Sequence, residues 1–253
     1  TTADGKVIVM DGGFDHDHDT LLDNLRRITG ERVPHVHAWF LSHPHVDHIS
    51  CFLEIMEHHR DALTFDHVYY NFPSVQFIKR EEREHFHTLQ RFYADLPLFV
   101  EKAVIVSAFD RYVIGGADFE CLYSPDAALK KNVANNASVV WKMTLADKTF
   151  LFLGDAGAEA GEKMLAMYKD TDQLKADYVQ MAHHGQNGVD KAFYEAVKPT
   201  ACLWCTPQWL WDNDAGKGFD THCWKTVTVR GWMEELGVKE HYIMKDGLQE
   251  IKL

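Results

Sequence analysis

FLSHPHVDHIS, residues 40–50, brings three histidines and one aspartate together within six positions. His43 and His45 lie two apart in an extended segment, so both side chains point the same way. Asp47 and His48 follow where the segment enters a helix that continues from residue 49, and they can face the same pocket. Imidazole and carboxylate groups at this spacing suit a borderline-soft divalent metal ion. The segment therefore predicts a metal site.

The chain has 16 histidines in all, and most of those outside this segment favour a less specific interpretation. His16, His18, His58 and His59 are scattered and are interpreted as ordinary polar residues. The segment 40–50 differs from them because a strand is predicted before it, a helix after it, and small or apolar residues separate its polar ones.

Composition describes an ordinary globular protein. The chain has 253 residues, 46% hydrophobic and 25% charged, which is enough to bury a sizeable core. Neither a linker-like stretch nor a fixed-period repeat divides it, so we predict one domain over residues 1–253. The formal net charge of −12 disfavours a nucleic-acid backbone as partner. The sequence does not indicate an oligomeric state.

The cysteines and the apolar runs say little about the cellular compartment of this protein. Five cysteines are scattered, and the C-x-x-C of Cys202 and Cys205 has no second pair, which favours buried free thiols over a zinc or redox site. No apolar run approaches the ~20 residues that span a bilayer. We expect no membrane span and favour a cytoplasmic over a secreted location. The abrupt start at Thr1 suggests a trimmed N-terminus.

Apolar periodicity predicts alternating strands and helices. Strands are expected at residues 6–10, 37–41, 66–72, 103–106, 111–114, 118–123, 138–145, 149–153, 178–182, 201–204, 242–244 and 249–252. Helices are expected at residues 20–29, from 49 onward, 77–94, 159–168, 191–197 and 224–236. Mixed sheets with helices outside them imply an α/β sandwich.

Four motifs together carry a family resemblance. HPHVDH resembles the H-x-H-x-D-H signature of the metallo-β-lactamase-fold hydrolases, and MDGG at 10–13, LFLGDAG at 151–157 and QMAHHGQ at 180–186 are similar to that family's other landmarks in the same order. The resemblance implies a four-layer αββα sandwich of two mixed β-sheets with outer helices. It also implies one or two strands before residue 6, which the sequence given does not include.

The resemblance also implies roles for individual residues. The implied metal ligands are His43, His45, Asp47, His48, Asp155, His183 and His184, and the implied catalytic residues among them are Asp47, Asp155 and His184. Asp155 would bridge two metals, and Asp11 would orient a metal-bound histidine. The sequence does not separate the two late histidines, although we lean slightly towards His183 as the ligand. Zinc is favoured, with manganese and iron as alternatives.

The chain departs from the family at one ligand. Most members carry another histidine between the signature and the bridging aspartate, whereas residues 123–142 contain none. Asn135, Asn136 and Ser138 occupy that neighbourhood, and Asn136 is predicted to support the site without binding metal. The pattern is similar to a branch with competence-type DNA-uptake hydrolases and phosphorylcholine esterases. One metal would then need water, substrate or a ligand such as His222.

A charge count selects the substrate class. Two divalent cations, two aspartates and a hydroxide leave one positive charge, which suits a small anionic or zwitterionic molecule. We predict a hydrolase acting on a small phosphodiester, phosphorylcholine-esterase-like. The alternatives are a nuclease of the DNA-uptake type, a lactone or ester hydrolase, and a metal-stabilised non-catalytic binding module. Candidate pocket residues are Trp209, Trp211, His222 and Tyr70, although a tryptophan-rich cap on the core is favoured over a cation cage.

Overall fold

The computed structural model describes residues 1–82, 86–125 and 128–253. They form an α/β fold with two β-sheets flanked by helices, as the sequence predicts. The chain divides into two compact units, Thr1–Val139 (unit 1) and Val140–Leu253 (unit 2). Two compact units can belong to one domain, so the expected single domain stays a prediction.

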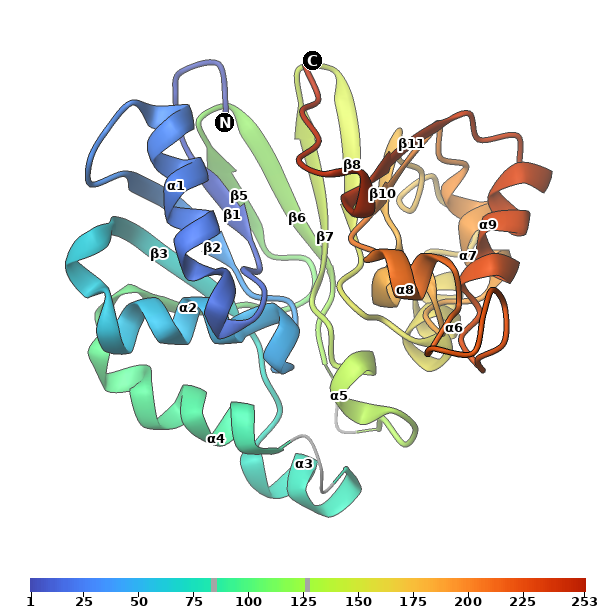
Figure 1. Ribbon diagram of the computed structural model, residues 1–253, viewed down its shortest axis with the longest axis horizontal. Helices are drawn as coiled ribbons and strands as arrows, with labels where there is room; N and C mark the ends of the chain where they lie inside the picture. Colours follow the sequence, from blue (N-terminus) through green and yellow to red (C-terminus); the bar gives the residue numbers. More distant parts are fainter. Residues whose placement is uncertain (83–85, 126–127) are drawn as a thin grey trace. The chain divides into compact units, whose positions relative to one another are not determined.

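Unit 1 holds a four-stranded sheet in the order β1-β2-β3-β4 and a hairpin of β5 and β6 (Figure 1). The strands are β1 (Ile8–Met10), β2 (His35–Phe40), β3 (Thr64–Tyr70), β4 (Ala103–Ile105), β5 (Arg111–Ile114) and β6 (Ala117–Tyr123). The helices are α1 (His18–Thr29), α2 (Val46–His58), α3 (Val75–Glu81), α4 (Phe86–Asp95) and α5 (Val133–Asn136). All neighbours in the four-stranded sheet are parallel, whereas the expectation was a mixed sheet.

The core of unit 1 lies between that sheet and its helices. Trp39 of β2 and Phe52 of α2 are fully buried and meet edge to face with ring centroids 5.0 Å apart. Phe92 of α4 packs against Tyr70 of β3 at 4.8 Å. Burying large aromatic side chains gives packing of this kind most of its stability. The carboxyl end of β2 is thereby held against the first turn of α2.

Unit 2 holds strands in the order β11-β10-β9-β8-β7. They are β7 (Val140–Leu145), β8 (Lys148–Phe152), β9 (Tyr178–Gln180), β10 (Ala201–Trp204) and β11 (Glu240–Ile243). The helices are α6 (Ala158–Met167), α7 (Lys191–Val197), α8 (Gln208–Trp211) and α9 (Thr226–Glu235), and α6, α7 and α9 lie beside strands β8 to β11 in Figure 1. Strands β7 and β8 are antiparallel, whereas β8, β9, β10 and β11 pair in parallel, so these strands form a mixed arrangement. The carboxyl ends of β8, β9 and β10 therefore meet at one edge.

Some predicted elements differ from the observed ones. The single helix expected at 77–94 is described as α3, which ends at Glu81, and α4, which begins at Phe86, while residues 83–85 lie outside the described residues. The run from Lys79 to Glu82 is polar, so the apolar period of the predicted helix is interrupted where α3 ends. The strand expected at 249–252 is absent because no neighbouring strand pairs with that largely exposed segment. The short helices α5 and α8 were not predicted.

Two compositional predictions are also tested. Of the helices in the described ranges, none combines the length and apolar character needed to cross a bilayer. Within the C-x-x-C pair, Cys202 is buried, as predicted, and burial raises the pKa of its thiol to about 12. Cys205 is exposed, which contradicts the prediction, because it follows the last residue of β10 and so leaves the sheet.

Candidate metal centre

The signature segment of unit 1 connects β2 to α2. His43 is fully buried and His48 is 3% exposed, and their ring centroids lie 4.1 Å apart. The His45 ring is 4.6 Å from that of His43. His45 is the last residue before α2, so Asp47 and His48 fall in the first helical turn, where a carboxylate oxygen of Asp47 lies within 4.8 Å of a His48 nitrogen. The structure therefore brings all four residues of the motif together in unit 1.

Asp11 contacts this cluster from the end of β1. Its Oδ2 accepts a hydrogen bond from His48 Nδ1 at 2.8 Å, and its Oδ1 accepts one from the backbone N–H of Ser42 at 2.7 Å. A carboxylate only accepts, so the His48 proton is on Nδ1 and Nε2 keeps its lone pair. Asp11 has a left-handed φ of 55°, a strained conformation for a residue other than glycine, of the kind that gathers at functional sites.

Ser42 links the Asp11 carboxylate to His43 through a second pair of hydrogen bonds. The Ser42 hydroxyl donates to Asp11 Oδ2 at 2.7 Å, so its oxygen accepts from His43 Nδ1, 3.0 Å away. His43 then also keeps its lone pair on Nε2. One carboxylate thus sets the tautomers of two histidines, one directly and one through a serine. The serine's part was not predicted, although its place between a strand and the histidine motif is a usable signal.

A second cluster lies in unit 2, where β8 and β9 end. Asp155 follows β8 and is only 1% exposed. Its Oδ2 lies 3.7 Å from His183 Nε2 and 3.6 Å from His184 Nε2. Both separations are longer than a hydrogen bond and close to the about 3.3 Å expected between two ligands of one tetrahedral zinc ion. These three side chains therefore fit a metal by their donor types and by their spacing.

The backbone distinguishes the two late histidines. The Nδ1 of His184 donates to the carbonyl oxygen of Cys205 at 2.9 Å, so Nε2 of His184 keeps its lone pair. Both residues have left-handed φ angles, 51° at His183 and 56° at His184. Gly185 follows at 78°, and a Cβ there would come within 2.4 Å of the Trp204 ring. The bond to Cys205 favours His184 as a ligand, against our slight lean towards His183, while the distances to Asp155 admit both.

Gln180 braces this cluster and was not predicted. Its Oε1 accepts from the backbone N–H groups of Leu153 and Gly154, both at 2.9 Å, and its Nε2 donates to the Gly154 carbonyl at 3.4 Å. The same carbonyl accepts from the His183 backbone N–H at 3.0 Å. The turns that carry Asp155 and His183 are thereby joined just before each side chain. Only the parallel pairing of β8 and β9 reveals this relationship.

The predicted tryptophan-rich segment contains two separate aromatic groups. Trp224 packs against Trp209 at 5.0 Å and against His222 at 3.8 Å, and Trp209 is 52% exposed. Trp211 instead packs against Trp204, and the Arg230 guanidinium lies over its ring at 4.2 Å. That cation–π contact gives Trp211 a packing role, in line with the favoured cap. Trp209, Trp211 and His222 stay predictions as pocket residues.

Two other predicted residues have contacts of their own. Tyr70 is 3% exposed and packs between Phe72 and Phe92 in the core of unit 1, and its role in a substrate pocket stays a prediction. The Asn136 side chain is buried and donates from Nδ2 to the carbonyl of Lys131 at 2.7 Å. That bond holds the turn before α5, and a role for Asn136 at the metal site stays a prediction.

His35, His37 and Asp66 form a further group with metal-ligating atoms in unit 1. His37 Nδ1 accepts from the backbone N–H of Val7 at 3.1 Å, which leaves the proton of the neutral ring on Nε2. His35 Nε2 is already bonded to Asp66 Oδ1 at 3.0 Å. Hydrogen bonding between strands accounts for this group, and no metal is needed.

The model of the metallo-beta-lactamase superfamily matches residues 2–183. This chain belongs to the metallo-beta-lactamase superfamily. The match contains the signature segment, Asp155 and His183, so the resemblance read from the motifs is confirmed for the superfamily. Members of the superfamily bind divalent metals, and each of the two clusters contains side chains that could hold one.

The similarity to solved structures supports the fold of this chain and nothing beyond it. The metallo-beta-lactamase fold protein YhfI from Bacillus subtilis is similar with a TM-score of 0.54 and 12% identity, over 98% of this chain and 88% of YhfI. The CmlA beta-hydroxylase E377D mutant is similar with a TM-score of 0.50 and 12% identity, over 85% of this chain. This chain spans only 44% of that hydroxylase. Among curated proteins, none matches the sequence.

Proposed function

We propose that this protein is a metal-dependent hydrolase whose centre uses both clusters of metallo-beta-lactamase landmarks. The ligands are His43, His45, Asp47 and His48 from unit 1 with Asp155, His183 and His184 from unit 2. Two divalent ions are held, zinc being favoured. Asp47, Asp155 and His184 act at the reacting groups. His222 remains the candidate for the ligand that the chain lacks between the signature and Asp155.

One observation carries the proposal: a buried carboxylate oxygen, Asp155 Oδ2, has two imidazole nitrogens at 3.6 and 3.7 Å. A buried carboxylate is costly unless positive charge or hydrogen bonds compensate it. Imidazole donors beside it at ligand–ligand spacing provide a place for a cation. The chemistry of the donors, nitrogen and oxygen, is that of zinc, manganese or iron sites.

Hydrogen-bond partners within the chain orient the histidines proposed as metal ligands. Asp11 holds His48 with its Nε2 lone pair available, and the Cys205 carbonyl does the same for His184. Such partners fix the orientation of a ligand and raise its basicity. When bound, a divalent zinc ion acts as a Lewis acid and lowers the pKa of water towards neutrality. These polar partners hold the imidazoles in place before a substrate arrives.

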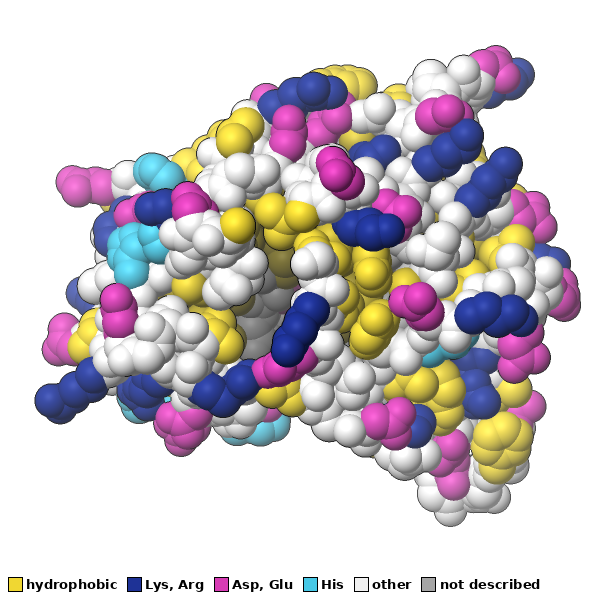
Figure 2. Space-filling view, turned by 90° about the horizontal axis from the view of Figure 1, so that it is seen from above, with side chains coloured by type: hydrophobic (Ala, Val, Ile, Leu, Met, Phe, Trp, Pro, Cys, Tyr) yellow, Lys and Arg dark blue, Asp and Glu magenta, His cyan; other side chains and the backbone are white. Residues whose placement is uncertain are grey.

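A small phosphodiester is the proposed substrate. Two divalent ions with two aspartates and a hydroxide leave a local positive charge, which attracts an anionic group. The whole chain has a formal net charge of −12, which disfavours a nucleic-acid strand. On the face drawn in Figure 2, Lys and Arg side chains are interspersed with Asp and Glu, and the described residues there form no continuous basic stripe. A zwitterionic ester of the phosphorylcholine type fits these charges.

The test combines metal analysis with a substrate panel. The protein is loaded with zinc, manganese or iron, and hydrolysis of bis-aryl phosphate, aryl phosphorylcholine, a lactone, a cephalosporin and DNA is measured. We expect two metals per chain and turnover of the phosphodiesters. Cleavage of DNA with no action on small phosphodiesters would overturn the substrate, and cleavage of the lactone alone would indicate an ester hydrolase.

Substitutions of the proposed ligands test the metal centre independently of the substrate. His48→Ala and Asp155→Asn should reduce both the bound metal and turnover, the latter by about a hundredfold or more. His16→Ala and Asp170→Asn are the matched controls, because both residues are exposed and belong to neither cluster. Full metal content in His48→Ala and Asp155→Asn would refute the proposed ligands.

A further inference from the structure

The side chain of Glu82 joins the end of α3 to the start of α5 within unit 1. Glu82 Oε1 accepts a hydrogen bond from the backbone N–H of Val133, and Oε2 accepts one from the backbone N–H of Ala134 at 3.1 Å. The two helices lie next to each other in Figure 1. Asn132, at the usual capping position, has a left-handed φ of 42°, and its Oδ1 accepts from Asn135 Nδ2 rather than from the helix backbone. A carboxylate from another helix therefore takes the place of the ordinary cap.

The two N–H groups that Glu82 binds belong to buried residues. Val133 and Ala134 are fully buried and are part of the hydrophobic core of unit 1. A buried N–H group without an acceptor costs free energy, so the carboxylate stabilises the turn that begins here. Ile78 of α3 is buried in the same core, and its carbonyl accepts from the Glu82 backbone N–H at 2.7 Å. Glu82 is thus held at its backbone as well as at its carboxylate.

The other end of this turn is bonded to the signature segment. The backbone N–H of Val139 donates to the Ser42 carbonyl at 2.9 Å. That carbonyl belongs to the peptide group that leads into His43, and the Ser42 hydroxyl lies 3.0 Å from His43 Nδ1. Every residue from 133 to 139 is buried. Because a closely packed interior transmits strain, a displacement at the start of the turn reaches Ser42.

We propose that Glu82 is a positioning residue for the proposed metal centre. It acts through the buried turn 133–139, which holds the Ser42 carbonyl and thereby the backbone and ring of His43. This inference rests on the proposed function, because His43 is a ligand there. Both carboxylate oxygens take part, so an amide cannot replace the carboxylate: glutamine offers one acceptor oxygen, and its NH₂ group would face the other backbone N–H.

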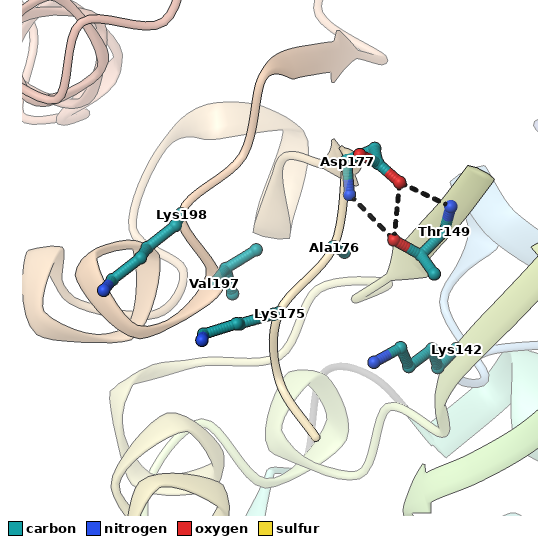
Figure 3. Close-up of a pocket in the computed structure, with 7 residues that line it drawn as sticks. All are labelled: Lys142, Thr149, Lys175, Ala176, Asp177, Val197 and Lys198. Atoms are coloured by element: carbon teal, nitrogen blue, oxygen red, sulfur yellow. Dashed lines mark hydrogen bonds between the residues drawn. The ribbon is translucent and has the colours of Figure 1, made fainter. Parts of the chain in front are cut away.

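Asp177 of unit 2 has a comparable role and provides a control. Its Oδ2 accepts from the backbone N–H and the hydroxyl of Thr149, both at 2.8 Å, near the start of β8 (Figure 3). Both carboxylates therefore bind backbone N–H groups, but only Glu82 binds the turn that contacts the signature segment. Asp177→Asn measures the loss of such a bond without a change in the turn 133–139.

The test compares Glu82→Gln with the wild type in the metal-free protein, by amide hydrogen exchange and by the imidazole nitrogen resonances of His43. We expect about tenfold faster exchange at Val133, Ala134 and Val139, because one buried N–H loses its acceptor, and a shifted His43 Nδ1 resonance. Asp177→Asn should leave Val139 and His43 unchanged. Faster exchange confined to Val133 and Ala134, or the same His43 shift in Asp177→Asn, would overturn the proposal.

Zinc titration extends the test to metal binding. Glu82→Gln should weaken zinc binding about two- to tenfold, less than the loss of a partner that touches a ligand directly, and should alter the visible spectrum of the cobalt-loaded protein. Glu81→Gln is the matched control, because this neighbouring carboxylate pairs with Arg80 on the surface, 2.6 Å away, and should change neither. Equal effects of Glu81→Gln and Glu82→Gln would show that net charge alone is responsible.

The two measurements separate this inference from the proposed function. A wild-type protein that binds no zinc would refute the proposed function, whereas the exchange at Val139 and the His43 resonances still decide whether Glu82 positions that imidazole. If Glu82→Gln does not fold, Glu82→Asp keeps the charge but is one methylene shorter. It should then show the same changes with a smaller amplitude, and wild-type exchange at Val139 in Glu82→Asp would count against the proposal.

Discussion

The imidazole of His184 donates from Nδ1 to the carbonyl oxygen of Cys205 at 2.9 Å. The next residue, Thr206, donates from its hydroxyl to the backbone carbonyl of His184 at 2.6 Å. Two consecutive residues after β10 thus hold both the ring and the backbone of one proposed ligand. Because His184 has a left-handed backbone, these bonds also stabilise a conformation that the residue would otherwise rarely adopt.

Replacing Thr206 by valine tests that support. The valine keeps the volume but removes the donor to the His184 carbonyl, so we expect a loss of about 1–2 kcal/mol in the free energy of unfolding. Metal affinity should fall about tenfold, as it does when other outer partners of ligands are removed. Chelator competition and the visible spectrum of the cobalt-loaded protein measure the effect on the ligand itself.

Thr200→Val is the matched control for Thr206→Val. Thr200 makes the same kind of bond, from its hydroxyl to the Asp177 carbonyl at 2.9 Å, just before β10. It should leave metal affinity and the cobalt spectrum unchanged. An unchanged spectrum in Thr206→Val as well would show that the bond to His184 does not position a ligand.

Asp11→Asn should weaken metal binding by about 10- to 100-fold. The carboxylate accepts three hydrogen bonds, from Ser42 N–H, Ser42 Oγ and His48 Nδ1, and an amide has one acceptor oxygen for them. The amide nitrogen would also donate, which disfavours the tautomer that leaves His48 Nε2 available. Isothermal titration with zinc measures the affinity, and exposed Asp61→Asn serves as control. Equal affinities for both variants would exclude an orienting role for Asp11.

Gln180→Ala should lower the free energy of unfolding by about 2–4 kcal/mol, because the N–H groups of Leu153 and Gly154 lose their acceptor. Urea unfolding of the metal-free protein measures this, with Gln249→Ala in the exposed C-terminal segment as control. We also expect slower metal uptake, since the turns of Asp155 and His183 then keep only the bond from the His183 backbone N–H to the Gly154 carbonyl. A loss below ~0.5 kcal/mol would mean that the Gln180 hydrogen bonds do not stabilise the fold.

Stability should depend on pH through Asp95 of α4. Burial, together with its hydrogen bond to Glu57, raises the pKa of Asp95 to about 6, whereas the hydrogen bond from Arg91 lowers the pKa of Glu57 to about 2. A raised carboxyl pKa favours the protonated native state, so its contribution is complete below about pH 4 and is lost as the pH rises through 6. The expected loss is about 1–3 kcal/mol.

Asp95→Asn should remove that dependence, because an amide donates to Glu57 at every pH. Thermal unfolding between pH 4 and 7.5 measures it, and Asp61→Asn should keep the wild-type slope. If Asp95→Asn and wild type lose stability in parallel over this range, Asp95 is not the responsible group.

Local patterns determined much of this protein. The alternation of apolar runs predicted most strands and helices, because burial imposes its period on the residues of each element. The order of HPHVDH, GDA and HHG predicted the superfamily, because ligand spacing within one turn or strand end is set by nearby backbone geometry. The end of α3 at Glu81 was missed because the apolar stripe that predicted a helix at 77–94 lies only at Phe86, Leu89, Phe92 and Tyr93.

Only the tertiary structure decided how the polar partners are arranged. Ser42 and Asp11 are 31 positions apart, and Tyr70 and Phe92 are 22 positions apart, so no short window of sequence joins either pair. The bonds of Gln180 to residues 153–154 and of His184 to Cys205 exist because parallel strands end at one edge of the sheet. Sequence supplies the donors and acceptors. Their pairing depends on strand order, which long-range packing sets.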